Sequence, residues 1–128
     1  MSGPARAGLL VYAKDLQRLA GFYEEVLTMK RLHESEELVV LQSPDIQLLV
    51  HRIPPPIAER IVVTSPPERR DNTALKFFFT VEDIPGTSAL ISSLGGIVFP
   101  EQWQGPGFMV NNACDPEGNV FQVRQRVA

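Results

Sequence analysis

The chain has 128 residues, the usual size of one domain. Hydrophobic residues make up 44% of it and charged residues 21%, which excludes a disordered chain and allows a sizeable buried core. The net charge of −3, without a long basic run, argues against a nucleic-acid partner. No apolar run is long enough for a signal peptide or a membrane span, so we expect no membrane partner. The single cysteine, Cys114, excludes an intrachain disulfide and fits a cytoplasmic location.

The first part of the chain predicts one strand, one helix and three further strands. Residues 9–13 have strand character, and Asp15 follows where a helix N-cap can accept hydrogen bonds from free backbone N–H groups. Apolar residues then recur at helical spacing as far as Leu27. Three strand-like runs come next, at residues 29–33, 38–42 and 46–53.

Residues 54–73 predict a proline-rich linker. Pro54, Pro55 and Pro56 cannot lie inside a sheet, because proline lacks the N–H that a strand ladder needs. Residues 61–63 of this linker predict either a short edge strand or an apolar contact with a partner.

The pattern then starts again. Residues 75–81 predict a strand, Asp83 repeats the N-cap 68 positions after Asp15, and a helix follows over residues 84–94. The pair Gly95 and Gly96 ends this helix, since glycine adopts the left-handed conformation at low cost. Three more strands are expected at residues 97–103, 108–114 and 120–126. Two modules, 1–53 and 74–128, therefore repeat one architecture within a single domain, 1–128.

Several short pieces follow one another in a characteristic order along the chain, namely residues 12–16, 21–23, 26–27, 79–83, 94–96 and the Asp-Pro-Glu-Gly-Asn turn at 115–119. Together these pieces resemble the vicinal oxygen chelate superfamily, which includes glyoxalases, bleomycin-resistance proteins and extradiol dioxygenases. One departure is Thr28, where the family often has glycine. The resemblance implies an α+β fold with paired βαβββ modules, whose curled mixed sheet surrounds a cleft and carries its helices outside. It also implies a homodimer.

In metal-using relatives, four positions in the cleft hold one divalent ion. The family spacing places Gly8, Gln47, Lys76 and Gln122 at these positions. Glycine has no ligand atom, a charged lysine repels a cation, and two neutral amides are a poor donor set for a divalent ion. We therefore expect no metal ion and no other cofactor. His51, four residues after Gln47 on the same strand face, is the alternative, displaced ligand.

Strand alternation predicts a mixed cleft wall with aromatic surface and polar tips, as small-molecule sites have. Lys76 and Arg124 favour an anionic ligand, and Tyr12, Phe78 and Trp103 offer aromatic surface for stacking. The predicted ligand-binding residues are Tyr12, Gln47, His51, Lys76, Phe78, Trp103, Gln122 and Arg124.

Three functions fit this pattern. The favoured one is a metal-free protein that binds or sequesters a small, partly aromatic, anionic compound. In this hypothesis the protein is a binding protein and not an enzyme. The second is a divalent-metal-dependent lyase, isomerase or dioxygenase that uses displaced ligands such as His51. The third is a non-catalytic interaction module whose cleft is filled by side chains.

Overall fold

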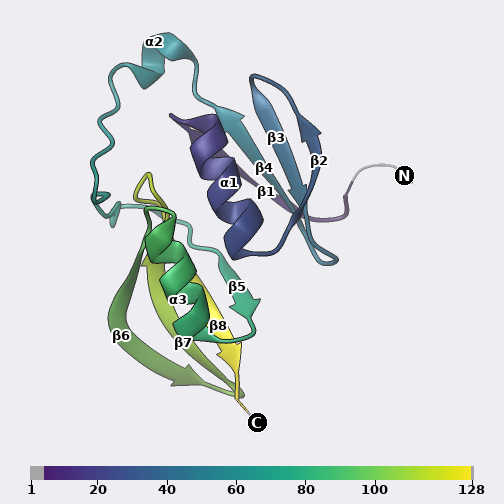
Figure 1. Cartoon of the computed structure of the whole chain (residues 1–128), viewed down its shortest axis with the longest axis vertical. Coiled ribbons are helices and arrows are strands. Elements are labelled where there is room, and N and C mark those ends of the chain that lie inside the picture. Colours follow the sequence, from purple (N-terminus) through teal and green to yellow (C-terminus); the bar gives the residue numbers. More distant parts are fainter. Residues whose placement is uncertain (1–4, 128) are drawn as a thin grey trace. The chain divides into compact units, whose positions relative to one another are not determined.

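The computed structural model describes residues 5–127, and the chain divides into two compact units between Val62 and Val63 (Figure 1). Each unit contains one four-stranded mixed sheet and one long helix. The predicted α+β class and its paired βαβββ modules are confirmed, and the strands form two separate sheets, one in each unit. No helix within residues 5–127 is long and apolar enough to cross a membrane.

The first unit has the strand order β1-β4-β3-β2, with β1 parallel to β4 and the other neighbours antiparallel. The side chain of Asp15 accepts a hydrogen bond from the N–H of Arg18 at 3.2 Å, so the predicted N-cap is confirmed. The elements are β1 (Gly8–Ala13), α1 (Leu16–Val26), β2 (Lys30–Glu34), β3 (Leu38–Gln42), β4 (Gln47–Arg52) and α2 (Pro55–Ala58).

The second unit repeats this arrangement with the order β5-β8-β7-β6, and β5 is parallel to β8. Asp83 caps its helix by accepting from the N–H of Gly86 at 2.7 Å. The elements are β5 (Phe78–Val81), α3 (Ile84–Ser93), β6 (Ile97–Gly105), β7 (Phe108–Cys114) and β8 (Val120–Arg126).

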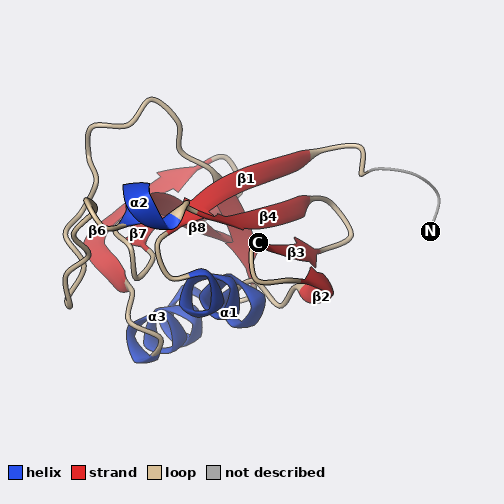
Figure 2. Ribbon diagram, turned by 90° about the horizontal axis from the view of Figure 1, so that it is seen from above, coloured by secondary structure: helices blue, strands red, loops and turns tan. Residues whose placement is uncertain are grey.

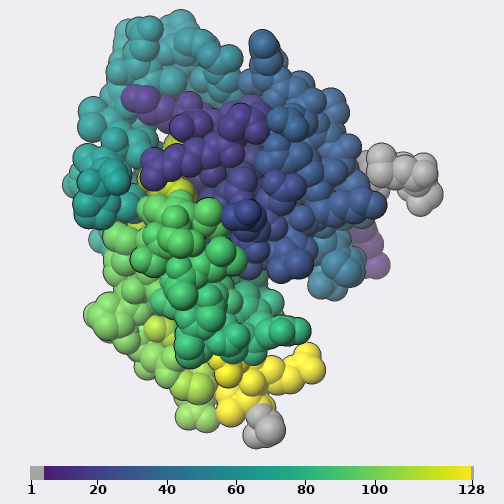
Figure 3. Space-filling model, in the orientation of Figure 1, coloured from purple at the N-terminus to yellow at the C-terminus, as the bar shows by residue number. Residues whose placement is uncertain are grey.

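One face of each sheet packs against the long helix of the same unit (Figure 2). In the first unit this face buries Val39, Leu41, Leu48 and Val50 completely beside α1. In the second unit the helix lies on β6 and β8. In the space-filling view α3, in green, forms part of the surface that faces the viewer (Figure 3). We call the opposite face of each sheet its helix-free face. Strand alternation places the predicted site residues on these helix-free faces.

The structure refines the sequence predictions in the region before β5. Residues 61–63 lie in no strand, which excludes the edge strand, one of the two alternatives for them. A short helix, α2, begins one residue after Pro54, since proline fits the first turn of a helix. The strand predicted from residue 75 begins only at Phe78, because the parallel ladder starts where the Gln122 N–H donates to the Phe77 carbonyl oxygen. Lys76 therefore lies just outside the strand.

The segment that precedes β5 is hydrogen-bonded to the Asp-Pro-Glu-Gly turn. The N–H of Arg70 donates to the Gly118 carbonyl oxygen at 3.0 Å, and Arg70 forms a parallel bridge with Asn119. Gly118 has a φ of +86°, and a Cβ atom there would lie 2.0 Å from the carbonyl oxygen of Glu68. Only glycine allows this close approach between the turn and the connecting segment.

Both long helices end with the same hydrogen-bond pattern. The N–H of Met29 reaches the Glu24 carbonyl, and that of Gly96 reaches the Ile91 carbonyl, as in a Schellman motif. The left-handed position of this motif is Gly95 after α3, with a φ of 92°, and Thr28 after α1, with a φ of 51°. Thr28 thus adopts a conformation that is costly for a β-branched residue and that glycine adopts without strain.

Candidate functional site

The helix-free face of the second unit brings together most of the predicted site residues. In the strand register, Phe78 lies opposite Gln122, and Thr80 lies opposite Arg124. Arg124 in turn pairs with Val110, whose other neighbour is Trp103. Residues directly opposite each other on neighbouring strands share a face, so one row of side chains runs from β5 to β6 across this surface.

Arg124 is the centre of this surface. Its guanidinium carbon lies 3.7 Å from the ring centroid of Phe78 and 4.4 Å from that of Phe108, so the two rings stack on it. One terminal nitrogen donates to the Gln122 side-chain oxygen at 3.2 Å. The buried Nε atom has no hydrogen-bond partner, and no carboxylate within residues 5–127 forms an ion pair with Arg124. This cation is therefore held by aromatic rings and an amide, without a counter-charge.

Phe108 is a site residue that the sequence did not reveal. Its ring reaches Arg124 because Gly105, its partner in the β6–β7 register, has no side chain. A Cβ atom at Gly105 would lie 2.3 Å from the Phe108 ring. The available signal was strand alternation, which places Phe108 on the same face as Val110, but only the register shows that it meets Arg124.

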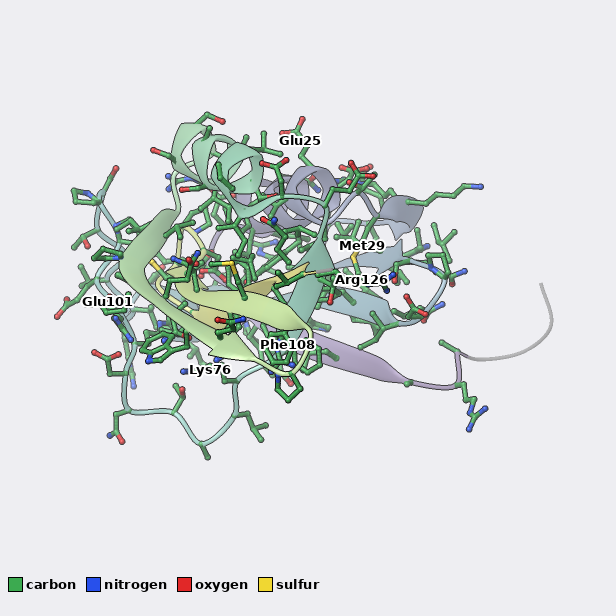
Figure 4. The ribbon with its side chains drawn as sticks, turned by 90° about the horizontal axis from the view of Figure 1, so that it is seen from below. Glu25, Met29, Lys76, Glu101, Phe108 and Arg126 are labelled. Atoms are coloured by element: carbon green, nitrogen blue, oxygen red, sulfur yellow. The ribbon has the colours of Figure 1, made fainter. Side chains whose placement is uncertain are left out.

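Lys76 lies beside the same face. Its ammonium group donates to the Asn112 side-chain oxygen at 3.4 Å, and Asn112 is the register partner of Gln122. Figure 4 shows Lys76 and Phe108 on the side of the second unit's sheet that faces away from α3. Lys76 forms no ion pair among the described residues, so it is a second cation without a carboxylate partner.

Trp103 supplies exposed aromatic surface at the other end of the row. Half of its side-chain surface is exposed, a fraction close to the 52% of Phe78. Since both residues occur on a surface with two uncompensated cations, the second unit offers flat apolar area next to positive charge.

The first unit's helix-free face has a different character. Tyr12 and His51 are register partners, and their rings meet edge to face at a centroid distance of 5.8 Å. The His51 Nδ1 atom lies 2.8 Å from the Arg52 carbonyl oxygen, so Nδ1–H donates and Nε2 is the ring's free nitrogen. Gln47 donates to the Gln42 side-chain oxygen at 2.9 Å. The His51 Nδ1–H and the Gln47 side-chain amide thus each donate to an oxygen of the first unit itself.

The strand registers refine the comparison of the four expected metal positions. Gln122 pairs with Phe78, two residues after Lys76. In the first unit, the residue two positions after Gly8 is Leu10, and Leu10 pairs with Leu49. Leu49 is thus the counterpart of Gln122, and Gln47, which lies opposite Gly8, is displaced from that position by two residues.

The donor atoms at these positions do not suit a divalent ion. Gly8 and Leu49 carry no ligand atom, Lys76 is cationic, and the oxygen of Gln122 accepts from Arg124. Within residues 5–127, no group of three or more His, Cys, Asp or Glu side chains could hold a metal ion. Cys114 offers no thiolate, because burial, followed by the charge of Asp115, raises its pKa from 9.0 to about 11.

This arrangement of two βαβββ units, each with one helix-covered and one helix-free sheet face, is a fold shared with a solved glyoxalase/bleomycin resistance protein/dioxygenase family enzyme. Residues 8–124 match the Glyoxalase-like domain family, so the chain belongs to that family. No curated protein matches the chain in sequence.

Solved structures share the fold at low sequence identity. A glyoxalase/bleomycin resistance protein/dioxygenase family enzyme from Burkholderia phytofirmans has a TM-score of 0.70 and 13% identity, covering 94% of this chain and 98% of its own. The fosfomycin resistance protein FosX from Listeria monocytogenes gives 0.65 and 15%, covering 99% and 95%. A lactoylglutathione lyase from Agrobacterium tumefaciens gives 0.61 and 21%, covering 98% and 96%.

Proposed function

We propose that this protein binds a small, partly aromatic anion on the helix-free face of its second unit, without using a metal ion. The observation that carries the proposal is Arg124, whose guanidinium contacts the rings of Phe78 and Phe108 and has no carboxylate partner within residues 5–127. A guanidinium without a counter-charge attracts an anion, and a ligand carboxylate that accepts hydrogen bonds from it compensates the charge.

The surroundings of Arg124 select for charge and shape together. Lys76 adds a second cation near Gln122, so the local potential favours an anion although the whole chain carries a charge of −3. The exposed rings of Phe78 and Trp103 give a flat ligand apolar area against which it can stack. A ligand with an aromatic ring and a carboxylate uses both properties.

The structural neighbours of the chain include a lyase and a fosfomycin resistance protein, and a shared fold does not decide between catalysis and binding. The donor set supports binding here. Gly8 and Leu49 cannot ligate a metal ion, and the cations Lys76 and Arg124 flank the remaining amide of Gln122. We therefore assign no step of the function to a metal ion.

The test compares benzoate with its neutral amide, benzamide, and with the non-aromatic anion cyclohexanecarboxylate. Trp103 is the only tryptophan in the chain, so its fluorescence reports binding, and calorimetry confirms it. We expect benzoate to bind at least fivefold more tightly than either relative. Arg124→Gln should weaken benzoate about tenfold or more, because hydrogen bonds to a charged group contribute roughly 1.5–3 kcal/mol.

Two variants provide the controls. Arg124→Lys keeps the charge but loses the planar stacking group, so its affinity should fall between those of the wild type and Arg124→Gln. Arg18→Gln makes the same change of charge at an exposed position on α1 and should stay within about twofold of the wild type. Equal affinity for benzoate and benzamide, or an unchanged Arg124→Gln, would contradict the proposal.

The proposal that the protein works without a metal ion has a separate test. Calorimetry with Ni²⁺, Zn²⁺, Fe²⁺ and Mn²⁺ should show no site tighter than roughly micromolar, whereas dedicated zinc sites bind far more tightly. A stoichiometric tight site that disappears in Gln122→Ala would refute it.

A second candidate function is a metal-dependent lyase, isomerase or dioxygenase that uses His51. The hydrogen bond from Nδ1–H to the Arg52 carbonyl favours it, because metal-binding histidines are usually oriented in this way with Nε2 free. This candidate predicts that His51→Ala removes turnover and metal affinity together. Metal affinity unchanged in His51→Ala would eliminate it.

A further inference from the structure

A small pocket lies in the second unit between residues 69–76 and the start of β8. Its volume is about 230 Å³, and Val120 lines it together with Arg69, Arg70, Asp71 and Lys76. We call residues 69–76 the basic segment. The pocket is smaller than the roughly 300–1,000 Å³ of sites for whole drug-sized ligands, so it has room for a single chemical group or a small ion.

The lining carries an excess of positive charge. Three cations face one carboxylate, and that carboxylate, Asp71, is paired with the Nε atom of Arg69. The guanidinium of Arg69 also stacks on Phe99 at 4.1 Å from the ring centroid. Arg69 is therefore already held by two interactions, and the charge that remains uncompensated belongs to Arg70 and Lys76.

Neither of these two cations has an anionic partner in the described part of the chain. Arg70 is half-buried and forms no ion pair within residues 5–127, and the Lys76 ammonium donates to the neutral Asn112 amide at 3.4 Å. Because the one carboxylate of this pocket, Asp71, is paired with Arg69, the charges of Arg70 and Lys76 repel each other, and an anion between them relieves this repulsion.

The backbone fixes the position of the pocket. The Arg70 N–H donates to the Gly118 carbonyl at 3.0 Å, and the missing side chain at Gly118 lets Glu68 approach the turn. The Asp-Pro-Glu-Gly turn thus holds the basic segment against β8 before any ligand arrives. A preorganised site binds more tightly, because its ordering cost does not fall on the binding step.

We infer that this pocket is a binding site for a doubly charged oxyanion, either phosphate itself or the phosphate group of a small molecule. The two uncompensated charges of Arg70 and Lys76 match a dianion, and a planar guanidinium suits two oxygens of a phosphate. The inference goes beyond the proposed function, because it concerns the basic segment and not the aromatic surface around Arg124. Lys76 borders both sites.

The experiment titrates the intact protein with inorganic phosphate at constant ionic strength, using chloride as the reference anion. Calorimetry should show one saturable site, and amide resonances of the basic segment and Val120 should shift. Arg70→Gln should weaken phosphate at least tenfold, and Lys76→Gln should weaken it several-fold. Arg18→Gln, the matched change of charge on α1, should stay within about twofold, and circular dichroism checks that each variant is folded.

Phenyl phosphate distinguishes the two sources of the oxyanion. If it binds more tightly than inorganic phosphate, the pocket holds the phosphate group of a larger molecule, whereas equal affinities indicate free phosphate. Absence of saturable phosphate binding, or an unchanged affinity in Arg70→Gln, would overturn the inference. Shifts confined to Phe78, Phe108 and Arg124 would also overturn it, while leaving the proposed function standing.

Discussion

The two units share a strand register but place different chemistry on it. Tyr12 pairs with His51 in the first unit, and Thr80 pairs with Arg124 at the same place in the second. The first pair is an edge-to-face contact between two rings, whereas Arg124 has rings and an amide around it but no counter-charge within residues 5–127. The comparison shows that the repeated backbone provides the scaffold and that the candidate site depends on side chains found in one unit only.

The largest expected difference between the units lies in how a glycine-to-alanine substitution changes the free energy of unfolding. Gly118→Ala should lower the free energy of unfolding by more than about 2 kcal/mol, because the left-handed backbone and the contact with Glu68 both oppose a Cβ atom. Gly21→Ala, within α1 where a Cβ atom meets nothing within 4 Å, should raise it by about 0.5–1 kcal/mol. Urea denaturation measures both. Similar effects of the two substitutions would show that Gly118 is not constrained.

The helix ends give a smaller, reciprocal effect. Gly95→Thr should destabilise the protein by about 1–2 kcal/mol, and Thr28→Gly should stabilise it by about 0.5–1 kcal/mol, since both residues occupy the left-handed position of a Schellman motif. Thermal and urea unfolding test the pair. A destabilised Thr28→Gly variant would mean that contacts of the threonine side chain outweigh its backbone strain.

The N-caps should differ least. Asp15→Ala and Asp83→Ala should each cost about 1 kcal/mol, because each carboxylate accepts from a free N–H in the first helical turn. The α3 helix buries only Ile84 and Ile91, whereas α1 buries six side chains. Hydrogen exchange in α3 should therefore accelerate more after Asp83→Ala than exchange in α1 after Asp15→Ala. Equal acceleration would show that burial does not set the difference.

Much of the fold was predictable from the sequence because its signals are local. The cap at Asp83 and the glycines after α3 mark helix ends through backbone chemistry that a linear pattern records. The start of β5 was not predictable, since it depends on where Gln122 first meets the neighbouring strand. The short helix α2 was hidden by a proline run that also fits a linker.

The candidate site was predictable only in part. Alternation placed Phe78, Gln122 and Arg124 on one face, and the register confirms that arrangement. It did not reveal Phe108, or the correspondence of Leu49 with Gln122, because both depend on pairing between distant strands. The roles of the predicted site residues in ligand binding stay predictions, as do the homodimer and the cytoplasmic location.

The pairing of Arg70 with Gly118 has a practical consequence for protein engineering. Arg70 is bonded to the turn that precedes β8, so the connecting segment is fixed from this residue onward. Only the part of the proline-rich segment before Arg70 can therefore be lengthened without breaking these contacts. A tag or spacer inserted after Val62 or Val63 would lengthen the connection between the units. The same insertion between Glu68 and Asp71 would move the backbone away from the turn and separate the strand bridge that Asn119 completes.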